Sequence, residues 1–241
     1  MLVLERDAAR QLVLNKAHQI VLNTGWLCDT PTPFRRAVLE RCRLEQFAHG
    51  KPIYSVGDEA GGMYGIVTGC LSISVAPQEQ GPYVAHFAMP GTWFGEASAF
   101  TRQPRRVGLT ASRDSELLHL PLHAIDEIVR QDPGAWRYFG LVTIAHLDMA
   151  IGGADDLMIR DHFKRFTAVL LRLGNCRRVS PRNGQPVEVD LNHEDLAHMA
   201  NVARTTAGAI LREMEANGHV SLAYRRINIL APDALRRELC D

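Results

Sequence analysis

Two short helical patterns separated by three residues constrain the fold of this 241-residue chain more than any other feature. In the first pattern, Asn192 is placed to cap a helix that begins at His193, with an apolar inner face four residues further on. In the second, apolar residues recur at i, i+3, i+4 and i+7, namely at Ala207, Ile210, Leu211 and Met214. The two patterns predict a pair of helices joined by a tight turn.

The outer face of the second predicted helix differs from an ordinary solvated face. It is small and polar, with arginine at both ends, and its members are Arg204, Thr205, Thr206, Gly208, Ala209 and Arg212. A solvated helix more often carries long side chains of both charges, whereas small side chains suit a surface that another body approaches closely. A helix N-terminus also presents free backbone N–H groups to phosphate.

A basic β-hairpin is predicted directly after this helix. Residues 219–223 and 227–230 are β-like, and Tyr224, Arg225 and Arg226 lie between them. Helix, turn, helix and hairpin together predict a winged helix-turn-helix that binds double-stranded DNA. The alternative is a helical hairpin packed on a sheet with no partner. The DNA-binding interpretation is favoured because face composition, turn length and hairpin coincide.

The charge of the chain is unevenly distributed. Its net charge is zero, which argues against indiscriminate binding to nucleic acid. Residues 162–241 carry 12 basic and 9 acidic side chains, whereas the preceding residues carry 15 and 18. A mildly basic C-terminal part is consistent with a polyanionic partner.

Short β-like runs alternate with glycine and proline turns in the middle of the chain. The runs cover 51–54, 63–67, 71–75, 83–88, 107–111 and 116–120. In LSISV, Leu71, Ile73 and Val75 share one face, which is the period of a half-buried strand. Many short strands at this spacing favour an antiparallel barrel or jelly roll.

A long helix is predicted over residues 133–160, about 42 Å at ~1.5 Å per residue. Its apolar residues exceed what one small barrel can cover, and they are Trp136, Phe139, Leu141, Ile144, Leu147 and Ile151. We therefore expect a partner helix from a second copy, and so a homodimer. Gly152 and Gly153 leave two alternatives: two helix backbones approach closely there, or the helix breaks. A further helix is expected from about 161 to 173.

The sequence does not have the features of a membrane protein or of a secreted protein. No apolar run approaches the ~20 residues that a membrane span needs, and the N-terminus lacks the pattern of a signal peptide. The five cysteines are scattered, odd in number and never in a CxxC pair, which favours a reducing environment over a disulfide framework or a zinc ribbon. We expect a cytoplasmic protein without a membrane partner.

The segment GTWFGEASAFTRQPRRV, residues 91–107, combines a small-residue turn with charged side chains. Gly95, Glu96 and Ala97 form the turn, and Arg106 and Val107 follow ten residues later. An arginine here could bind a phosphate, and the glutamate could accept a hydrogen bond from a ribose hydroxyl. The alternative, that Glu96 and Arg106 pair with each other or lie on solvated turns, stays open.

From about residue 25 onward the chain resembles the Crp/Fnr superfamily of bacterial transcription regulators. The resemblance is carried by GKPIYSVGDEAGGMYGIVTGCLSISV, PGTWFGEASAF and LNHEDLAHMANVARTTAGAILREMEANGHV, and by the order of barrel, long helix and winged helix. It implies a regulator of transcription that is not an enzyme. It also implies RNA polymerase as a further partner.

At the effector pocket the family pattern is matched unevenly. The resemblance aligns the Gly-Glu pair and Arg106, but Val107 stands where the family has Ser or Thr. Ala150 and Ile151 stand where cyclic-AMP-binding members have a Thr-Ser pair on the long helix. Each lost hydroxyl removes a hydrogen bond worth ~0.5–1.5 kcal/mol. Cyclic AMP is therefore not expected, and the effector is unknown.

No cofactor or metal is predicted. The oxygen-sensing branch of the family holds an iron–sulfur cluster with four thiolates, several near the N-terminus, where this chain has Cys28 alone. None of the ten histidines stands in an arrangement diagnostic of haem.

The second predicted helix, which would be the recognition helix, also differs in sequence from that of family members that read a TGTGA-like half-site. Arg204 matches their first arginine, but Thr205 and Ala209 replace the following Glu and the later Arg. Arg204 can read guanine through two hydrogen bonds, worth ~1–3 kcal/mol. We expect Arg212, Arg225 and Arg226 to hold phosphates, and the half-site to differ.

We therefore predict an α+β chain in four parts: an N-terminal helical segment (1–48), an antiparallel jelly-roll barrel of cyclic-nucleotide-binding type (49–132), a dimerisation helix (133–160) and a winged helix-turn-helix domain (161–241). One alternative is a cupin-like metal enzyme, for which the barrel offers His86, His119 and Glu96 but no HxH pair. Another is a regulator whose barrel senses no ligand.

Overall fold

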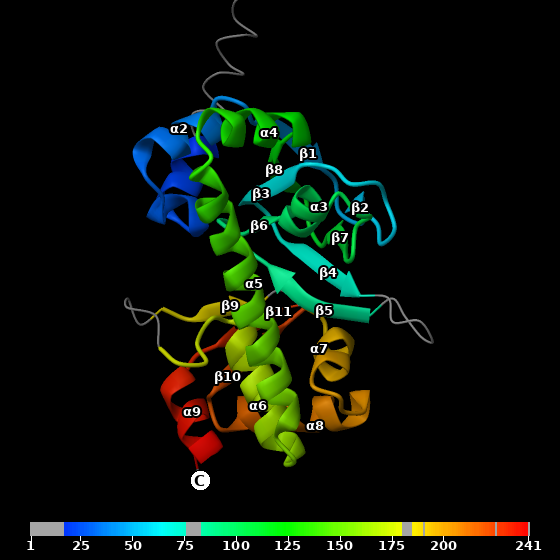
Figure 1. Cartoon of the computed structure of the whole chain (residues 1–241). Helices are drawn as coiled ribbons and strands as arrows, with labels where there is room; N and C mark the ends of the chain where they lie inside the picture. Colours follow the sequence, from blue (N-terminus) through cyan, green and yellow to red (C-terminus); the bar gives the residue numbers. More distant parts are fainter. Residues whose placement is uncertain (1–16, 76–82, 180–184, 190, 225, 241) are drawn as a thin grey trace, which may run out of the picture. The chain divides into compact units, whose positions relative to one another are not determined.

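The chain divides into two compact units, residues 1–146 and 147–241 (Figure 1). The structure is a computed structural model that describes residues 17–75, 83–179, 185–189, 191–224 and 226–240. Each unit has its own sheet structure and its own buried residues. The division falls inside the long helix rather than at either of its ends.

Two four-stranded antiparallel sheets form the β-part of the first unit. One sheet has the strand order β1-β8-β3-β6 and the other β2-β7-β4-β5. The strands are β1 (Arg43–Phe47), β2 (Pro52–Tyr54), β3 (Met63–Thr68), β4 (Leu71–Val75), β5 (Tyr83–Ala88), β6 (Trp93–Phe94), β7 (Gly108–Ala111) and β8 (Ser115–Leu120). All six predicted β-runs are strands, which confirms the predicted antiparallel architecture.

The turn between β3 and β4 lets the chain pass from one sheet to the other. Gly69 has a φ of 91°, a left-handed conformation that glycine adopts without steric cost. In β4 the side chains alternate as expected, because Leu71 and Ile73 are buried and the two serines are partly exposed. Leu71, Ile73, Leu109 and Leu117 belong to the hydrophobic cluster that both sheets share.

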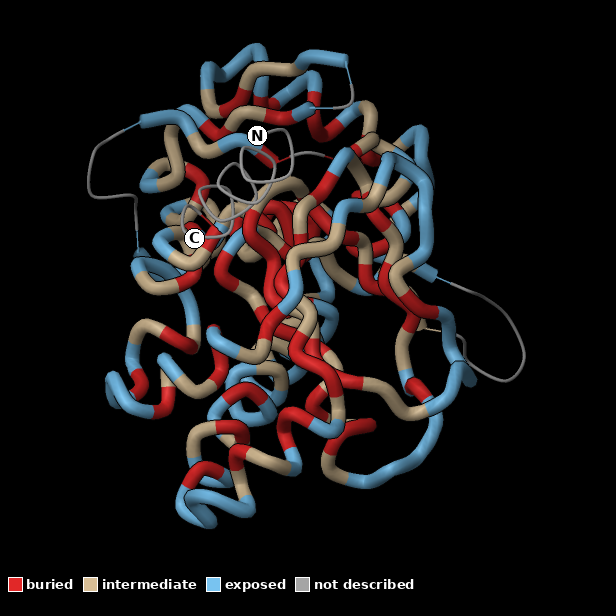
Figure 2. The backbone as a smooth tube through the Cα atoms, turned by 90° about the horizontal axis from the view of Figure 1, so that it is seen from above, coloured by how far each residue is buried: buried red, intermediate tan, exposed pale blue. Residues whose placement is uncertain are grey.

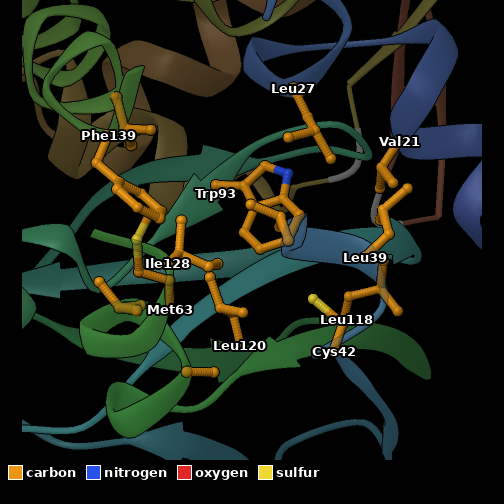
Figure 3. Close-up of a cluster of buried hydrophobic side chains, with 14 of the residues drawn as sticks. Val21, Leu27, Leu39, Cys42, Met63, Trp93, Leu118, Leu120, Ile128 and Phe139 are labelled. Atoms are coloured by element: carbon orange, nitrogen blue, oxygen red, sulfur yellow. The ribbon is translucent and has the colours of Figure 1, made fainter. Parts of the chain in front are cut away.

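A second hydrophobic cluster lies between one sheet and the helices of the first unit. Its contributors include α2 (Thr32–Leu39), α4 (Leu122–Gln131) and the first turns of α5 (Ala135–Met158). Figure 3 shows Trp93, Met63, Leu118 and Leu120 from the strands gathered with Phe139 and Ile128 from the helices. Gly65 is required beneath Trp93, because a Cβ at this position would overlap the indole ring.

The N-terminal segment is helical only in part. A helix covers 17–23, the 3-10 helix η1 covers Trp26–Asp29, and α2 follows, with Pro31 at its N-cap. The helical pieces are separated at 24–25 and again at 30–31. Residues 43–47 belong to the predicted helical segment, but they form β1 because they pair along their whole length with β8.

The long helix α5 is continuous through its glycine pair. The nearest side chain to both Gly152 and Gly153 is that of Arg172, 3.7 Å from the Cβ position of each glycine. Arg172 lies on α6 (His162–Leu173) and bonds Asp156, further along α5, at 2.8 Å. The helix therefore does not break, and Arg172 of the neighbouring helix packs against it at the glycine pair.

The second unit combines helices with a three-stranded sheet of order β10-β11-β9. Its remaining elements are β9 (Val187–Val189), α7 (His193–Met199), α8 (Arg204–Ala216), β10 (Val220–Ala223), β11 (Arg226–Ile229) and α9 (Pro232–Cys240). Along the helices of this unit buried residues alternate with exposed ones within each turn, as amphipathic sequences require. Figure 2 shows the same mixture of buried and exposed residues over the whole backbone. The predicted winged helix-turn-helix is confirmed, with β9 as an additional strand beside the hairpin.

Candidate nucleic-acid interface

A side-chain cap fixes the start of α7. The Asn192 carboxamide oxygen accepts a hydrogen bond from the backbone N–H of Asp195 at 2.8 Å, and its amide donates to the Asp195 carboxylate at 2.8 Å. Glu194 and Asp195 also place negative charge at the positive end of the helix dipole. The predicted cap is therefore present, and Leu196, Met199 and Ala200 are buried behind it.

The turn between α7 and α8 is short and well bonded. Asn201 adopts a φ of 50°, which asparagine tolerates better than most residues. Its N–H donates to the carbonyl of His198 at 3.0 Å, and the N–H of Val202 donates to Ala197 at 3.0 Å. This geometry redirects the chain within three residues and sets the angle at which α8 leaves α7.

The inner face of α8 is apolar and buried, as its spacing predicted. Ala207, Ile210, Leu211 and Met214 are each at most 4% exposed. The N-cap residue is Ala203, whose methyl group cannot accept a hydrogen bond. The N–H groups of the first turn therefore receive no side-chain cap and are chemically suited to bind a phosphate.

The outer face of α8 is presented to solvent. Arg204, Thr205, Ala209 and Arg212 are exposed, and Thr206 and Gly208 are partly exposed. A Cβ at Gly208 would meet no atom within 4 Å, so the surface there is open. Neither Arg204 nor Arg212 forms an ion pair within the described part of the chain. Both guanidinium groups are therefore available to an external anion or base edge.

The wing, which is the hairpin formed by β10 and β11, offers fewer unpaired positive charges than its sequence suggested. Arg226 forms an ion pair with Glu188 of β9, with 3.1 Å between Nη1 and Oε2, and both side chains are close to half exposed. Arg225, the other predicted phosphate contact, lies outside the described residues. Tyr224, at the tip of the hairpin, is 92% exposed. The wing is tied to α8 because the N–H of Leu222 donates to Glu215 at 2.9 Å.

In the first unit, the turn formed by Gly95, Glu96 and Ala97, here called the cassette turn, is held by a contact that the sequence did not reveal. Gly95 has a φ of 104° and precedes Glu96, the first residue of α3 (Glu96–Thr101). Glu96 is 6% exposed, and its Oε1 lies 2.8 Å from Nδ1 of His146 on α5. The His146 ring also stacks on Phe94, with 4.7 Å between centroids. Because fifty residues separate the two partners, no local pattern could have paired them.

The arginine beside this turn is Arg105 rather than Arg106. Arg105 is 5% exposed, donates to the carbonyl oxygen of Gly62 at 2.9 Å, and lies 4.1 Å from the centre of the Tyr54 ring. Its guanidinium fills the space that a Cβ at Gly61 or Gly95 would need. Arg106 is exposed. Both arginines are present in the sequence. Successive side chains point to opposite sides as the chain enters β7, and this decides that Arg105 points inward and Arg106 outward.

Because Arg105 rather than Arg106 lies beside the cassette turn, the comparison with the family pattern shifts by one residue. With Arg105 beside Gly95, the next residue is Arg106, so the hydroxyl position is again not filled by Ser or Thr. Val107 packs against the core that the two sheets share, and Ala97 is partly buried on α3. Of the predicted pocket residues, Gly95 lies beside Arg105, Glu96 is buried, and the side chain of Arg106 is exposed.

The groups that a cupin-like metal site would need are not brought together. His119 bonds Glu45 at 2.8 Å, whereas Glu96 bonds His146. Within the residues that the structure describes, no group of three or more metal-binding side chains gathers at one place. None of the helices in the described ranges is long and apolar enough to span a membrane.

Comparison with known families and proteins agrees with this architecture. A cyclic nucleotide-binding domain family matches residues 44–132, and a Crp-like helix-turn-helix domain family matches residues 164–238. The first match covers the two β-sheets and the cassette. The second covers α6 to the wing and most of α9.

Curated relatives and solved structures share most of their length with the chain. A global nitrogen regulator from Synechococcus elongatus is 23% identical over 81% of this chain and 89% of its own length. The transcriptional regulator LdrP from Thermus thermophilus is 25% identical over 81% and 96%. The structure of FixK2 from Bradyrhizobium japonicum superposes with a TM-score of 0.67, at 18% identity over 81% of this chain and 96% of that one.

Proposed function

Because this chain is a transcription regulator of the Crp/Fnr superfamily, with a cyclic-nucleotide-binding domain and a Crp-like helix-turn-helix, we propose that it binds a specific DNA site as a homodimer. The observation that carries the proposal is the outer face of α8. Its two arginines have no ion pair within the described residues, and the side chains between them are small.

The dimer is supported by an exposed apolar stripe on α5. Leu141, Ile144, Leu147, Ile151 and Met158 are 44–80% exposed in the single chain. They recur every three, four or seven residues, which is the spacing of a coiled-coil seam. A second copy of the same helix is the simplest cover for such a stripe. In a two-fold dimer, the two recognition helices would enter successive major grooves about 34 Å apart.

We propose that Arg204 reads a guanine in each half-site and that Thr205, Thr206 and Ala209 contact neighbouring bases. An arginine pairing with guanine through two hydrogen bonds discriminates by ~1–3 kcal/mol. Arg212 is proposed to bind phosphate, which fixes the register of the protein on DNA. Arg226 contributes less, because Glu188 already neutralises part of its charge.

The barrel is proposed to gate DNA binding through a ligand other than cyclic AMP, or to hold no ligand at all. Arg105 is buried without a carboxylate partner in the described ranges, so it is the group that would bind an anionic effector. A thermal-shift screen against nucleotides and small anions separates a ligand-gated barrel from one that serves dimerisation only. We further propose a cytoplasmic location and contact with RNA polymerase, as expected of a transcription regulator.

A gel-shift series tests the proposal. Genomic fragments that the protein selects should bind at least ~10³-fold more tightly than random DNA of equal length at the same salt concentration. Footprints on those fragments should show two half-sites one helical turn apart. Equal affinity for selected and random fragments would refute sequence-specific binding.

A further inference from the structure

One arginine of α6 bonds the chain just beyond the ends of two other helices. The guanidinium of Arg165 donates from Nε to the carbonyl of Ala200 at 2.7 Å and from Nη2 to that of Asn201 at 3.2 Å. Its Nη1 donates to the carbonyls of Ile159 at 2.8 Å and Arg160 at 3.2 Å. One side chain therefore joins four backbone carbonyls from two separate segments of the second unit.

The four acceptor carbonyls lie just beyond the C-terminal ends of α5 and α7. α5 ends at Met158, so Ile159 and Arg160 follow its last turn, and α7 ends at Met199, so Ala200 and Asn201 follow that one. Each helix also carries partial negative charge at its C-terminus. A cation shared between two such ends is favourable for both. Within the described part of the chain, Arg165 forms no ion pair with a carboxylate.

Only a forked cation can make this arrangement. A guanidinium has five N–H groups in a fixed plane, whereas a lysine offers one nitrogen on a flexible stem. The turn held by Arg165 is the one that contains Asn201 in its left-handed conformation and leads directly into α8. The contact therefore connects the end of the long helix to the residues that orient the recognition helix.

We propose that Arg165 is a positioning residue for DNA recognition, which holds the turn before α8 against the end of α5. The expected effect on DNA affinity rests on the proposed function, that α8 reads DNA. The expected effect on the turn in the free protein rests on the hydrogen bonds of Arg165 alone. Loss of the guanidinium should loosen the turn and reduce DNA affinity without removing a phosphate contact.

Amide hydrogen exchange in the free, full-length protein tests the first consequence. In Arg165→Ala, the amides of Asn201 and Val202 should exchange about tenfold faster than in the wild type, as expected if the turn opens locally more often. Lys164→Ala is the matched control, because it removes the same charge from the neighbouring position of α6. Unchanged exchange in folded Arg165→Ala, or equal acceleration in both variants, would overturn the proposal.

DNA binding over a range of salt concentrations tests the second consequence. Folded Arg165→Ala should bind a selected site about tenfold more weakly, with the salt dependence of the wild type, and Lys164→Ala should stay within about twofold. A fall in the salt slope of about one would identify Arg165 as a phosphate contact and reject the positioning role. Arg165→Lys replaces the alanine variant if that variant does not fold, and it should show the same direction of change.

The two measurements separate the failure of this inference from the failure of the proposed function. If the wild type selects no DNA site, sequence-specific binding is refuted, and the exchange experiment alone decides the role of Arg165. If the wild type selects a site and Arg165→Ala binds it normally, the proposed function stands and the positioning role is rejected.

Discussion

Replacement of Ile151 by alanine should weaken the proposed dimer by a calculable amount. Ile151 is 57% exposed in the single chain, and full burial of an isoleucine is worth ~1.5–3 kcal/mol. Burying the exposed part of Ile151 in a dimer therefore contributes ~1–1.5 kcal/mol to the free energy of association. Alanine keeps only the part of this that comes from one methyl group. About 1 kcal/mol is lost per protomer and about 2 kcal/mol per symmetric dimer, which raises the dimer Kd about 30-fold.

Sedimentation equilibrium over a range of protein concentrations measures this change. Leu230→Ala is the matched control, because Leu230 is also a large apolar residue, 44% exposed, but follows β11 and does not belong to the α5 stripe. Its dimer Kd should stay within about twofold of the wild type. An Ile151→Ala dimer as stable as the wild type, or an equal loss in the control, would show that α5 isn't the dimer interface.

Four further substitutions test other parts of the account. Asp156→Ala leaves two arginines without their shared buried carboxylate, so the free energy of unfolding in urea should fall by about 3 kcal/mol; a loss below about 1 kcal/mol contradicts this. The pKa of Asp161 is lowered, chiefly by the hydrogen bond that it accepts from a backbone amide in the first turn of α6, so its ionised cap stabilises the fold above its ordinary pKa of 3.8 and is lost as the pH falls below that value. Asp161→Asn should remove this acid-dependent part of the denaturation curve, and an unchanged curve refutes the assignment. Arg226→Ala should reduce the salt slope of DNA binding by clearly less than Arg212→Ala, which should reduce it by about one, because Glu188 already pairs with Arg226; equal reductions would show that this ion pair doesn't persist on DNA.

Periodic patterns predicted the second unit closely. The stripe of Ala207, Ile210, Leu211 and Met214 is buried as a unit, because a helix with one apolar face has a single way to cover it. Asn192 caps α7 as expected, since capping depends on a residue and its neighbours within one turn. Both signals are local in sequence, and local signals suffice for helices and their ends.

Contacts between distant segments were not accessible from the sequence in the same way. The Glu96–His146 hydrogen bond joins the cassette turn to the long helix, and neither residue carries a pattern that points to the other. Arg105 and Arg106 are adjacent, so the sequence offered two candidates for one position, and the path of the chain into β7 decided between them. The helix continues through the glycine pair on α5, and the side chain nearest to that pair comes from Arg172 on a different helix.

Strand assignments failed where pairing, rather than propensity, makes the strand. β1 has the sequence RLEQF, which contains two charged residues and no β-branched residue, yet it pairs with β8 along five positions. β6 comprises Trp93 and Phe94 alone and exists because it bonds β3. Such short or polar strands depend on a neighbouring strand that is present only in the folded chain.

Selection of bound DNA from a random pool, carried out in parallel for the wild type and Arg204→Ala, tests the central claim most directly. The account predicts that the wild type enriches a two-fold symmetric motif with an invariant G·C pair in each half-site. Arg204→Ala should enrich the same motif with that pair relaxed, at a cost of ~1–3 kcal/mol in affinity for the original site. Identical motifs for the two proteins, or no enrichment by the wild type, would show that the outer face of α8 does not read DNA.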